Sequence, residues 1–76
     1  ISDNYNSKFY ISAVNTALKI NPNNIDYLNT LTKLHMKNKD RTGALSSFAK
    51  VYGLSVEYDL PTDYLLEQLH EINKIH

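Results

Sequence analysis

The chain contains no cysteine, so neither a disulfide bond nor a thiolate metal site can help to stabilise it. Such a composition is more typical of a cytoplasmic protein than of a small secreted one. The sequence also has no run of about 18 uncharged apolar residues and no basic start followed by an apolar stretch. We therefore expect a cytoplasmic protein with no membrane partner.

A net charge is also lacking, since eight basic residues balance eight acidic ones. This balance excludes a general electrostatic attraction to nucleic acid or to anionic lipid. The charges are nevertheless unevenly distributed: seven of the basic and three of the acidic residues precede position 51, whereas one basic and five acidic residues follow. Such polarity would suit end-to-end stacking or an oriented partner, although charges that are simply solvated explain it as well.

The length of 76 residues predicts one small domain, which buries only about 60% of the surface that its unfolded chain exposes. Because the sequence starts at Ile1 rather than at methionine, we expect a fragment of a longer protein. Residues 1–76 are interpreted as a single helical repeat domain.

Two prolines and two glycines are the only strong breaks in the chain, and both prolines lie where the helical spacing of apolar residues stops. The pattern predicts no strand and four helices, at about residues 4–20, 25–38, 41–57 and 63–76, with Gly53 loosening the third helix without ending it. The expected N-terminal caps are Ser2 or Asp3, Asp40 and Thr62. The expected apolar faces are Phe9, Ala13, Val14, Ala17 and Leu18; Leu28 and Leu31 with Thr32 and His35; Ala44, Leu45, Phe48, Val51 and Tyr52; and Leu65, Leu66, Leu69, Ile72 and Ile75.

The chain matches itself at a shift of 34 residues. This shift pairs Val14 with Phe48 and Leu31 with Leu65, and the other pairs of apolar residues are Ile11 with Leu45, Ala17 with Val51 and Ile20 with Leu54. A 34-residue unit of two helices is the spacing of tetratricopeptide repeats. The first and third helices then take the place of the second helix of a unit, and the second and fourth helices take the place of the first.

The residues at these positions resemble the tetratricopeptide motif. In its first helix, Leu28, Leu31, Thr32 and His35 stand at the spacings of Trp-x-x-Leu-Gly-x-x-Tyr, with Thr32 and His35 departing from the usual Gly and Tyr. Ala44 and Phe48 match the Ala and the aromatic residue of the second motif helix. The resemblance implies an all-α fold made of antiparallel helical hairpins of tetratricopeptide type, with four helices in a right-handed stack.

From Ala17 onward, the chain also resembles the bacterial transcriptional activator domain. The matching residues are Asp40-Arg41, Ala44-Leu45, Phe48, Glu57, Pro61, Thr62, Leu69 and Ile72, with Lys39 replacing the usual Gly before Asp40. That family adjoins a winged-helix DNA-binding domain and, in some members, a receiver domain of a two-component system. The resemblance implies a protein–protein interaction and oligomerisation module of a transcription regulator, which reaches DNA only through a domain outside this chain. A scaffold or co-chaperone repeat that binds a peptide tail is the alternative.

No arrangement in the sequence favours catalysis. None of His35, His70 and His76 has a second ligand at the spacing of four residues that places two metal donors on one helical face. Asp63, Glu67 and Glu71 have the spacing of paired acid–base carboxylates, but a solvated stripe is the simpler interpretation. We expect a non-enzyme with no cofactor and no metal, in which His35 packs in the aromatic position of the repeat.

Two surfaces are candidates for protein contacts. Asn29, Lys33, Met36 and Lys37 lie on the helix face that lines the concave groove of tetratricopeptide arrays, where polar donors and a flexible Met can receive an acidic or carboxylate-bearing peptide. A solvated face is the alternative for these four residues. Phe9, Ile11 and Ala13 lie on the first helix, which lacks a neighbour on its outer side, and they are candidates for contact with a preceding unit or with a second copy.

Overall fold

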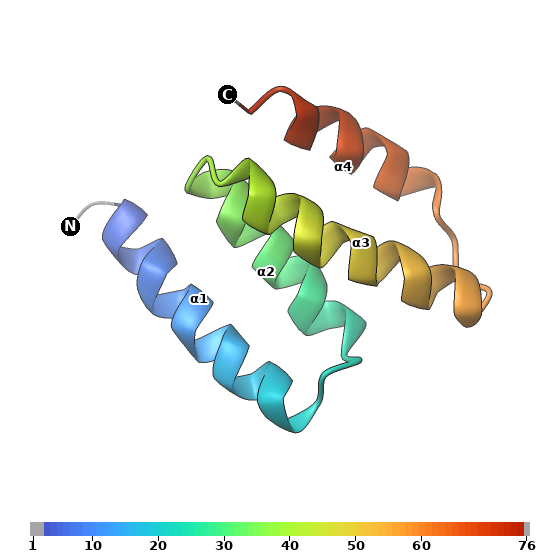
Figure 1. The fold of residues 1–76 in the computed structure, drawn as a ribbon, viewed down its shortest axis with the longest axis horizontal. Helices are drawn as coiled ribbons and strands as arrows, with labels where there is room; N and C mark the ends of the chain where they lie inside the picture. Colours follow the sequence, from blue (N-terminus) through green and yellow to red (C-terminus); the bar gives the residue numbers. More distant parts are fainter. Residues whose placement is uncertain (1–2, 76) are drawn as a thin grey trace.

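The structure, a computed structural model, describes residues 3–75 and the side chains of residues 8–75. Four helices make up the described chain, which contains no strand: α1 (Asp3–Ile20), α2 (Ile25–Lys37), α3 (Arg41–Glu57) and α4 (Asp63–Asn73). Successive helices reverse direction, so α1 and α3 run one way while α2 and α4 run the other (Figure 1). The prediction of an all-helical fold with four helices is confirmed. The tetratricopeptide type of the hairpins and the hand of the stack remain predictions.

The helix ends follow from local hydrogen bonds. Asn24 caps α2, where its side chain accepts a hydrogen bond from the Tyr27 amide at 3.0 Å. Asp40 caps α3 and accepts from the Gly43 amide at 3.0 Å. Thr62 holds the cap position of α4 without a side-chain cap hydrogen bond. Of the two cap candidates for the first helix, Ser2 lies outside the described residues and Asp3 is already the first residue of α1.

Two turns end their helices in the same unusual way. Lys39 after α2 and Asp59 after α3 have positive φ angles of 59° and 57°, in the left-handed region that glycine normally occupies. The amide of the next residue then reaches back to the last turn, so Asp40 donates to the His35 carbonyl and Leu60 to the Ser55 carbonyl, both at 2.8 Å. This pattern is the Schellman motif, formed here without glycine.

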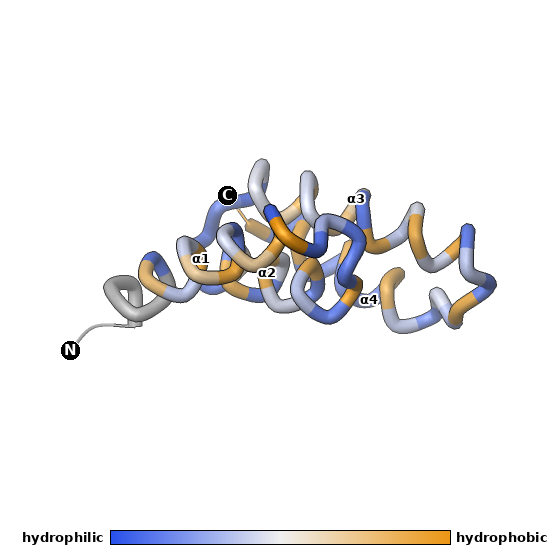
Figure 2. The backbone as a smooth tube through the Cα atoms, turned by 90° about the horizontal axis from the view of Figure 1, so that it is seen from below, coloured by the Kyte–Doolittle hydropathy of each residue, from blue (hydrophilic) through white to orange (hydrophobic). Residues whose placement is uncertain are grey.

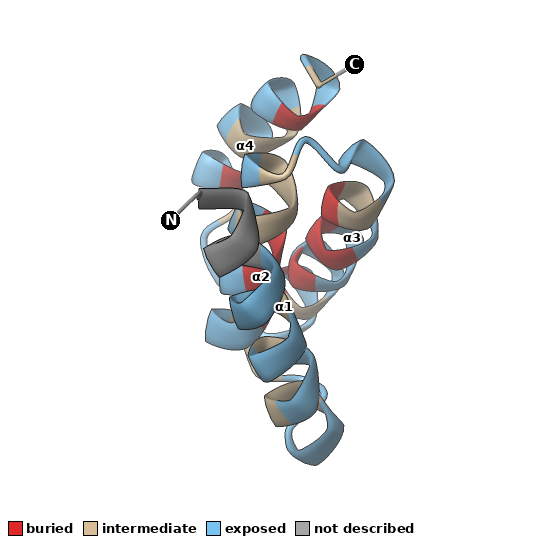
Figure 3. Cartoon of the chain, turned by 90° about the vertical axis from the view of Figure 1, so that its left-hand side faces the viewer, coloured by how far each residue is buried: buried red, intermediate tan, exposed pale blue. Residues whose placement is uncertain are grey.

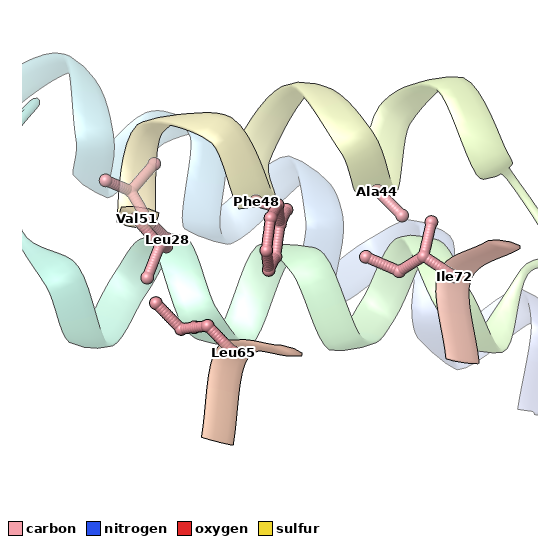
Figure 4. Close-up of a cluster of buried hydrophobic side chains, with 6 residues drawn as sticks. All are labelled: Leu28, Ala44, Phe48, Val51, Leu65 and Ile72. Atoms are coloured by element: carbon pink, nitrogen blue, oxygen red, sulfur yellow. The ribbon is translucent and has the colours of Figure 1, made fainter. Parts of the chain in front are cut away.

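The core lies where α2, α3 and α4 meet. Its buried apolar side chains are Leu28, Ala44, Phe48, Val51, Leu65 and Ile72 (Figure 4). Thr32, Ser47 and Ser55 are buried beside them, and the hydroxyls of Thr32 and Ser47 donate to carbonyls of their own helices. Such back-bonding satisfies these two buried hydroxyls within their own helices, whereas the buried Ser55 hydroxyl has no partner among the described residues.

α1 packs at the edge of this core without contributing a buried side chain. Among residues 8–20, Ile11, Val14, Ala17 and Leu18 are half-buried and the others are exposed (Figure 3). The expected inward stripe of this helix was therefore wrong for Phe9 and Ala13, because both face away from α2. Tyr52 and Leu66 were also expected on inner faces and are exposed, since the inner positions of α3 and α4 belong to Val51 and Leu65.

The molecule is a plate with a thickness of 16 Å and lateral extents of 40 Å and 31 Å (Figure 2). That thickness accommodates two helices packed 8–10 Å apart, so every helix reaches the surface. The accessible surface is 5350 Å², whereas a folded monomer of 8.7 kDa has about 4,700 Å². The flat shape thus leaves more surface accessible to solvent than a compact domain of this size would. No described helix has the length and apolar character needed to cross a membrane.

Candidate functional site

α2 provides the first wall of a surface groove. Asn29, Lys33 and Met36 follow one another at intervals of four and three residues, which places them on one helical face beside the face that buries Leu28 and Leu31. These are three of the four residues expected in the groove. The fourth, Lys37, is exposed but lines neither of the two hollows described below.

α4 provides the opposite wall with Tyr64, Glu67, Gln68 and Glu71. The Asn29 Nδ2 donates to the Tyr64 hydroxyl at 3.4 Å and thereby ties the two walls together. Asn29 and Tyr64, which are hydrogen-bonded across the groove, are 35 positions apart, and Lys33 and Glu67, which line the same hollow, are 34 positions apart. Such spacing requires α2 and α4 to run in parallel and in register, which agrees with the 34-residue match in the sequence.

The groove consists of two adjoining hollows. The first has a volume of about 350 Å³ and is lined by Asn29, Lys33, Met36, Tyr64, Glu67, Gln68 and Glu71. The second has a volume of about 450 Å³ and is lined by Met36, Lys39, Glu71, Lys74 and Ile75. Met36 and Glu71 line both hollows, so the two form one path along the molecule. A path of this kind accommodates an extended peptide better than a compact small molecule.

The charges of the groove alternate along its length. Lys33 stands on the α2 wall, whereas Glu67 and Glu71 stand on the α4 wall, and Lys39 and Lys74 lie at the far end. The Lys74 ammonium lies 3.1 Å from the Glu71 carboxylate, and both side chains are solvent-exposed. The acidic ligand expected from α2 alone would therefore meet two carboxylates on the other wall. The geometry instead suits a peptide that carries both charges.

Two buried oxygen atoms also border the groove. The Oδ1 of Asn29 and the Oε1 of Gln68 accept no hydrogen bond from the described residues. Each is an amide acceptor beside the space that a ligand would fill, and an unpaired buried acceptor costs about 1–3 kcal/mol. Neither oxygen is accessible from the groove, so a ligand would reach it only after the side-chain amide rotates.

The sequence analysis did not include the α4 wall. It assigned Glu67 and Glu71 to a solvated stripe and gave no role to Tyr64 or Gln68. The 34-residue match contained the signal needed to find them, because it places α4 in the position of α2 in the next unit. The face of α4 that corresponds to Asn29, Lys33 and Met36 was therefore already identifiable as the facing wall.

His35 has a structural partner. Its half-buried ring places Nδ1 3.3 Å from the Asp40 Oδ2, next to the cap of α3. A Cβ atom at Gly43 would lie 2.5 Å from the same carboxylate oxygen and 2.7 Å from that ring nitrogen. The glycine thus leaves the space in which this pair of side chains sits, and the half-buried His35 packs beside the cap of α3.

The remaining candidates show no catalytic arrangement in the part of the chain that the structure describes. His70 is exposed on α4, and His76 lies outside the described residues. No group of three or more metal-binding side chains is gathered among residues 3–75. The Ser47 hydroxyl is buried and donates to the carbonyls of Gly43 and Ala44, so it is engaged within its own helix.

The candidate contact residues of α1 divide between two faces. Phe9 and Ala13 are exposed on the outer side, whereas Ile11 is half-buried and borders a hollow that it shares with His35. Ile20 lies on the same outer side as Phe9, because eleven residues complete about three helical turns. The outer face of α1 is therefore defined by Phe9, Ala13, Thr16 and Ile20, all of which are exposed.

Comparisons with models of protein families, with curated proteins and with solved structures find no match to this chain. The proposals that follow rest on the residues and on the geometry described above.

Proposed function

We propose that this chain is a protein–protein interaction module that holds a peptide segment of a partner protein in the groove between α2 and α4. The observation that carries the proposal is the pair of parallel helices, which face each other in register and present alternating charges, amide groups and a flexible Met along one path. Peptide recognition uses such a surface, in which polar groups fix the register and apolar contacts supply affinity.

The preferred ligand in this proposal is an extended peptide with an acidic and a basic side chain a few residues apart. Its acidic group faces Lys33, and its basic group faces Glu67 or Glu71. The side chains of Asn29 and Gln68 offer further polar contacts along the groove. The module catalyses no reaction and needs no cofactor for this role.

A more specific version of the proposal is that the module belongs to a bacterial transcription regulator, in which it controls an attached DNA-binding domain through protein contacts. The support for this form is the resemblance of residues 17–76 to the bacterial transcriptional activator domain. A scaffold or co-chaperone that captures a peptide tail would use the same groove. Both forms require that the groove bind peptide, which makes peptide binding the property to test first.

The test is selection of binders from a random peptide library displayed on phage, with the 76-residue chain immobilised. Selected peptides are then titrated against the wild-type chain and against Lys33→Glu. Replacing attraction with repulsion at one ligand charge is expected to weaken binding about tenfold, which corresponds to about 1.4 kcal/mol. Lys50→Glu is the matched control, because Lys50 is exposed on α3 and does not line the groove.

If the selected peptides bind Lys33→Glu and Lys50→Glu as tightly as they bind the wild type, the peptide site lies outside the groove between α2 and α4. Failure to select any peptide, with the chain shown to be folded by its helical circular dichroism, would argue against a peptide-binding role.

A further inference from the structure

Two exposed apolar faces lie at opposite ends of the plate. The first is the outer face of α1, on which Phe9 is 66% and Ile20 is 78% exposed. The second, here called the α3–α4 face, consists of Ala49, Tyr52 and Val56 on α3 and Leu66 on α4, with Val56 58% and Leu66 64% exposed. Together the two faces contain five of the ten large apolar side chains that the described chain leaves exposed to solvent.

The residues of each face are contiguous for geometric reasons. Ala49, Tyr52 and Val56 follow one another at intervals of three and four residues and so form one stripe along α3. Leu66 stands on the flank of α4 that also carries Asn73, and the Asn73 Oδ1 accepts a hydrogen bond from the Arg41 Nη2 on α3 at 3.3 Å. The side of α4 that carries Leu66 is therefore the side that borders α3.

The internal repeat identifies what fits the α3–α4 face. Shifting the chain by 34 residues places α1 on α3 and α2 on α4, so the helix that would follow α4 in the pattern is equivalent to α1. α3 packs against α2, and in the same way an α1 helix supplied by another molecule can pack against α4. The outer face of α1, which is uncovered in its own chain, then becomes the buried side of that contact.

The charges of the two ends are complementary. Lys8 and Lys19 are exposed on α1 and are the only charged residues among positions 8–20. α4 carries Asp63, Glu67 and Glu71, of which the two glutamates line the groove, and it has no basic residue other than His70. α3 contributes Glu57 together with Arg41 and Lys50, so α3 and α4 hold four acidic residues against two basic ones. Contact between the same ends of two copies would bring like charges together. Docking of α1 on the α3–α4 face instead brings a basic helix to a surface with a net negative charge.

We propose that this chain associates head to tail, with the outer face of α1 of one copy docked on the α3–α4 face of a second copy. The inference deepens the proposed function, because it names one partner of the interaction module. The contact is heterologous and leaves a free α1 at one end and a free α3–α4 face at the other. Assembly therefore continues with concentration rather than stopping at a dimer.

The test uses sedimentation equilibrium of the 76-residue chain at concentrations up to about 1 mM, where weak contacts are populated. We expect the mean mass of the wild type to rise steadily with concentration and to fall again when salt is added. Two double variants block one face each: Phe9→Asp with Ile20→Asp, and Val56→Lys with Leu66→Lys. Each is expected to remain a monomer alone, because all four positions are exposed and the fold does not depend on them.

The decisive measurement is the equimolar mixture of the two double variants. One retains an intact α3–α4 face and the other an intact outer face of α1, so the mixture is expected to form a heterodimer that cannot grow further. Asn15→Gln is the control, since it changes an exposed position of α1 that lies outside the outer face and leaves the charge of the helix unaltered. This control is expected to associate like the wild type.

A wild type that stays monomeric over the whole range would overturn the inference, as would a mixture of folded variants that does not pair. A wild type that stops at a dimer would also overturn it, because that behaviour indicates a closed and symmetric contact. These outcomes differ from a failure of the proposed function: a monomeric chain that binds selected peptides at Lys33 retains the groove and loses only self-association.

Discussion

The two glycines of α3 offer a matched pair of substitutions with opposite expected effects. Gly53 lies within the helix, and no atom lies within 4 Å of the position that a Cβ would take. Replacing glycine with alanine in a helix interior gains about 0.8–1.0 kcal/mol. We therefore expect Gly53→Ala to raise the free energy of unfolding by about 1 kcal/mol, which corresponds to about 4–8 °C in the melting temperature of a domain of this size.

The same substitution at Gly43 has a structural cost. The new Cβ would lie 2.5 Å from the Asp40 Oδ2, so this carboxylate must move. Its other oxygen accepts the capping hydrogen bond from the Gly43 amide at 3.0 Å, and loss of such a cap costs about 1 kcal/mol. The contact of Asp40 with His35 at 3.3 Å is disturbed as well. We expect Gly43→Ala to be less stable than Gly53→Ala by about 1–2 kcal/mol.

Thermal melting followed by helical circular dichroism measures both variants against the wild type. Whether the Asp40 carboxylate causes the penalty is tested by introducing Gly43→Ala into an Asp40→Ala background, where the carboxylate that the new Cβ would approach is absent. The penalty of Gly43→Ala should shrink in that background, because the two residues interact directly. Equal gains in melting temperature at both glycines would show that the space around Gly43 is not the reason for a glycine there.

Two further predictions concern the turn after α2 and the core. Lys39→Gly should raise the melting temperature by several degrees, because a non-glycine residue in the left-handed region costs about 1 kcal/mol, and Lys39→Ala is the control that removes the charge and keeps the strain. Ala44→Glu and Leu31→Asp should each abolish cooperative melting, because either places an unpaired charge among buried side chains. Cooperative melting of either core variant near the wild-type temperature would contradict the packing of α2 against α3.

The helices were predictable from the sequence because their ends depend on local chemistry. Pro22 and Pro61 lie at breaks in apolar spacing, and α2 and α3 begin and end within one residue of the expected positions. α3 passes through Gly53 as expected, since one exposed glycine lowers helix stability without removing a hydrogen bond. Which apolar residues are buried was harder to predict. Leu65 and Leu66 are neighbours of equal hydrophobicity, and only the position of α3 decides that Leu65 is buried.

The candidate site was half predictable for a similar reason. The α2 face was found because Asn29, Lys33 and Met36 share one helical face, which sequence spacing reveals directly. The charge of the groove was not found, because it depends on which side chains of α4 lie across from Lys33. Glu67 and Glu71 stand at positions that sequence alone cannot distinguish from solvated ones. The ligand preference changes as a result, from an acidic peptide to one that carries both charges.

The order in which the helices pack also bears on how the chain folds. Each described helix packs mainly on its neighbour in sequence, α1 on α2, α2 on α3 and α3 on α4, so most contacts close short loops. Chains with such local contacts fold in microseconds to milliseconds, since little loop entropy is lost before the contacts form. The hairpin of α2 and α3 contains most of the buried side chains and is the natural nucleus. α1 contributes no buried side chain among residues 8–20 and packs against this core through the half-buried Leu18.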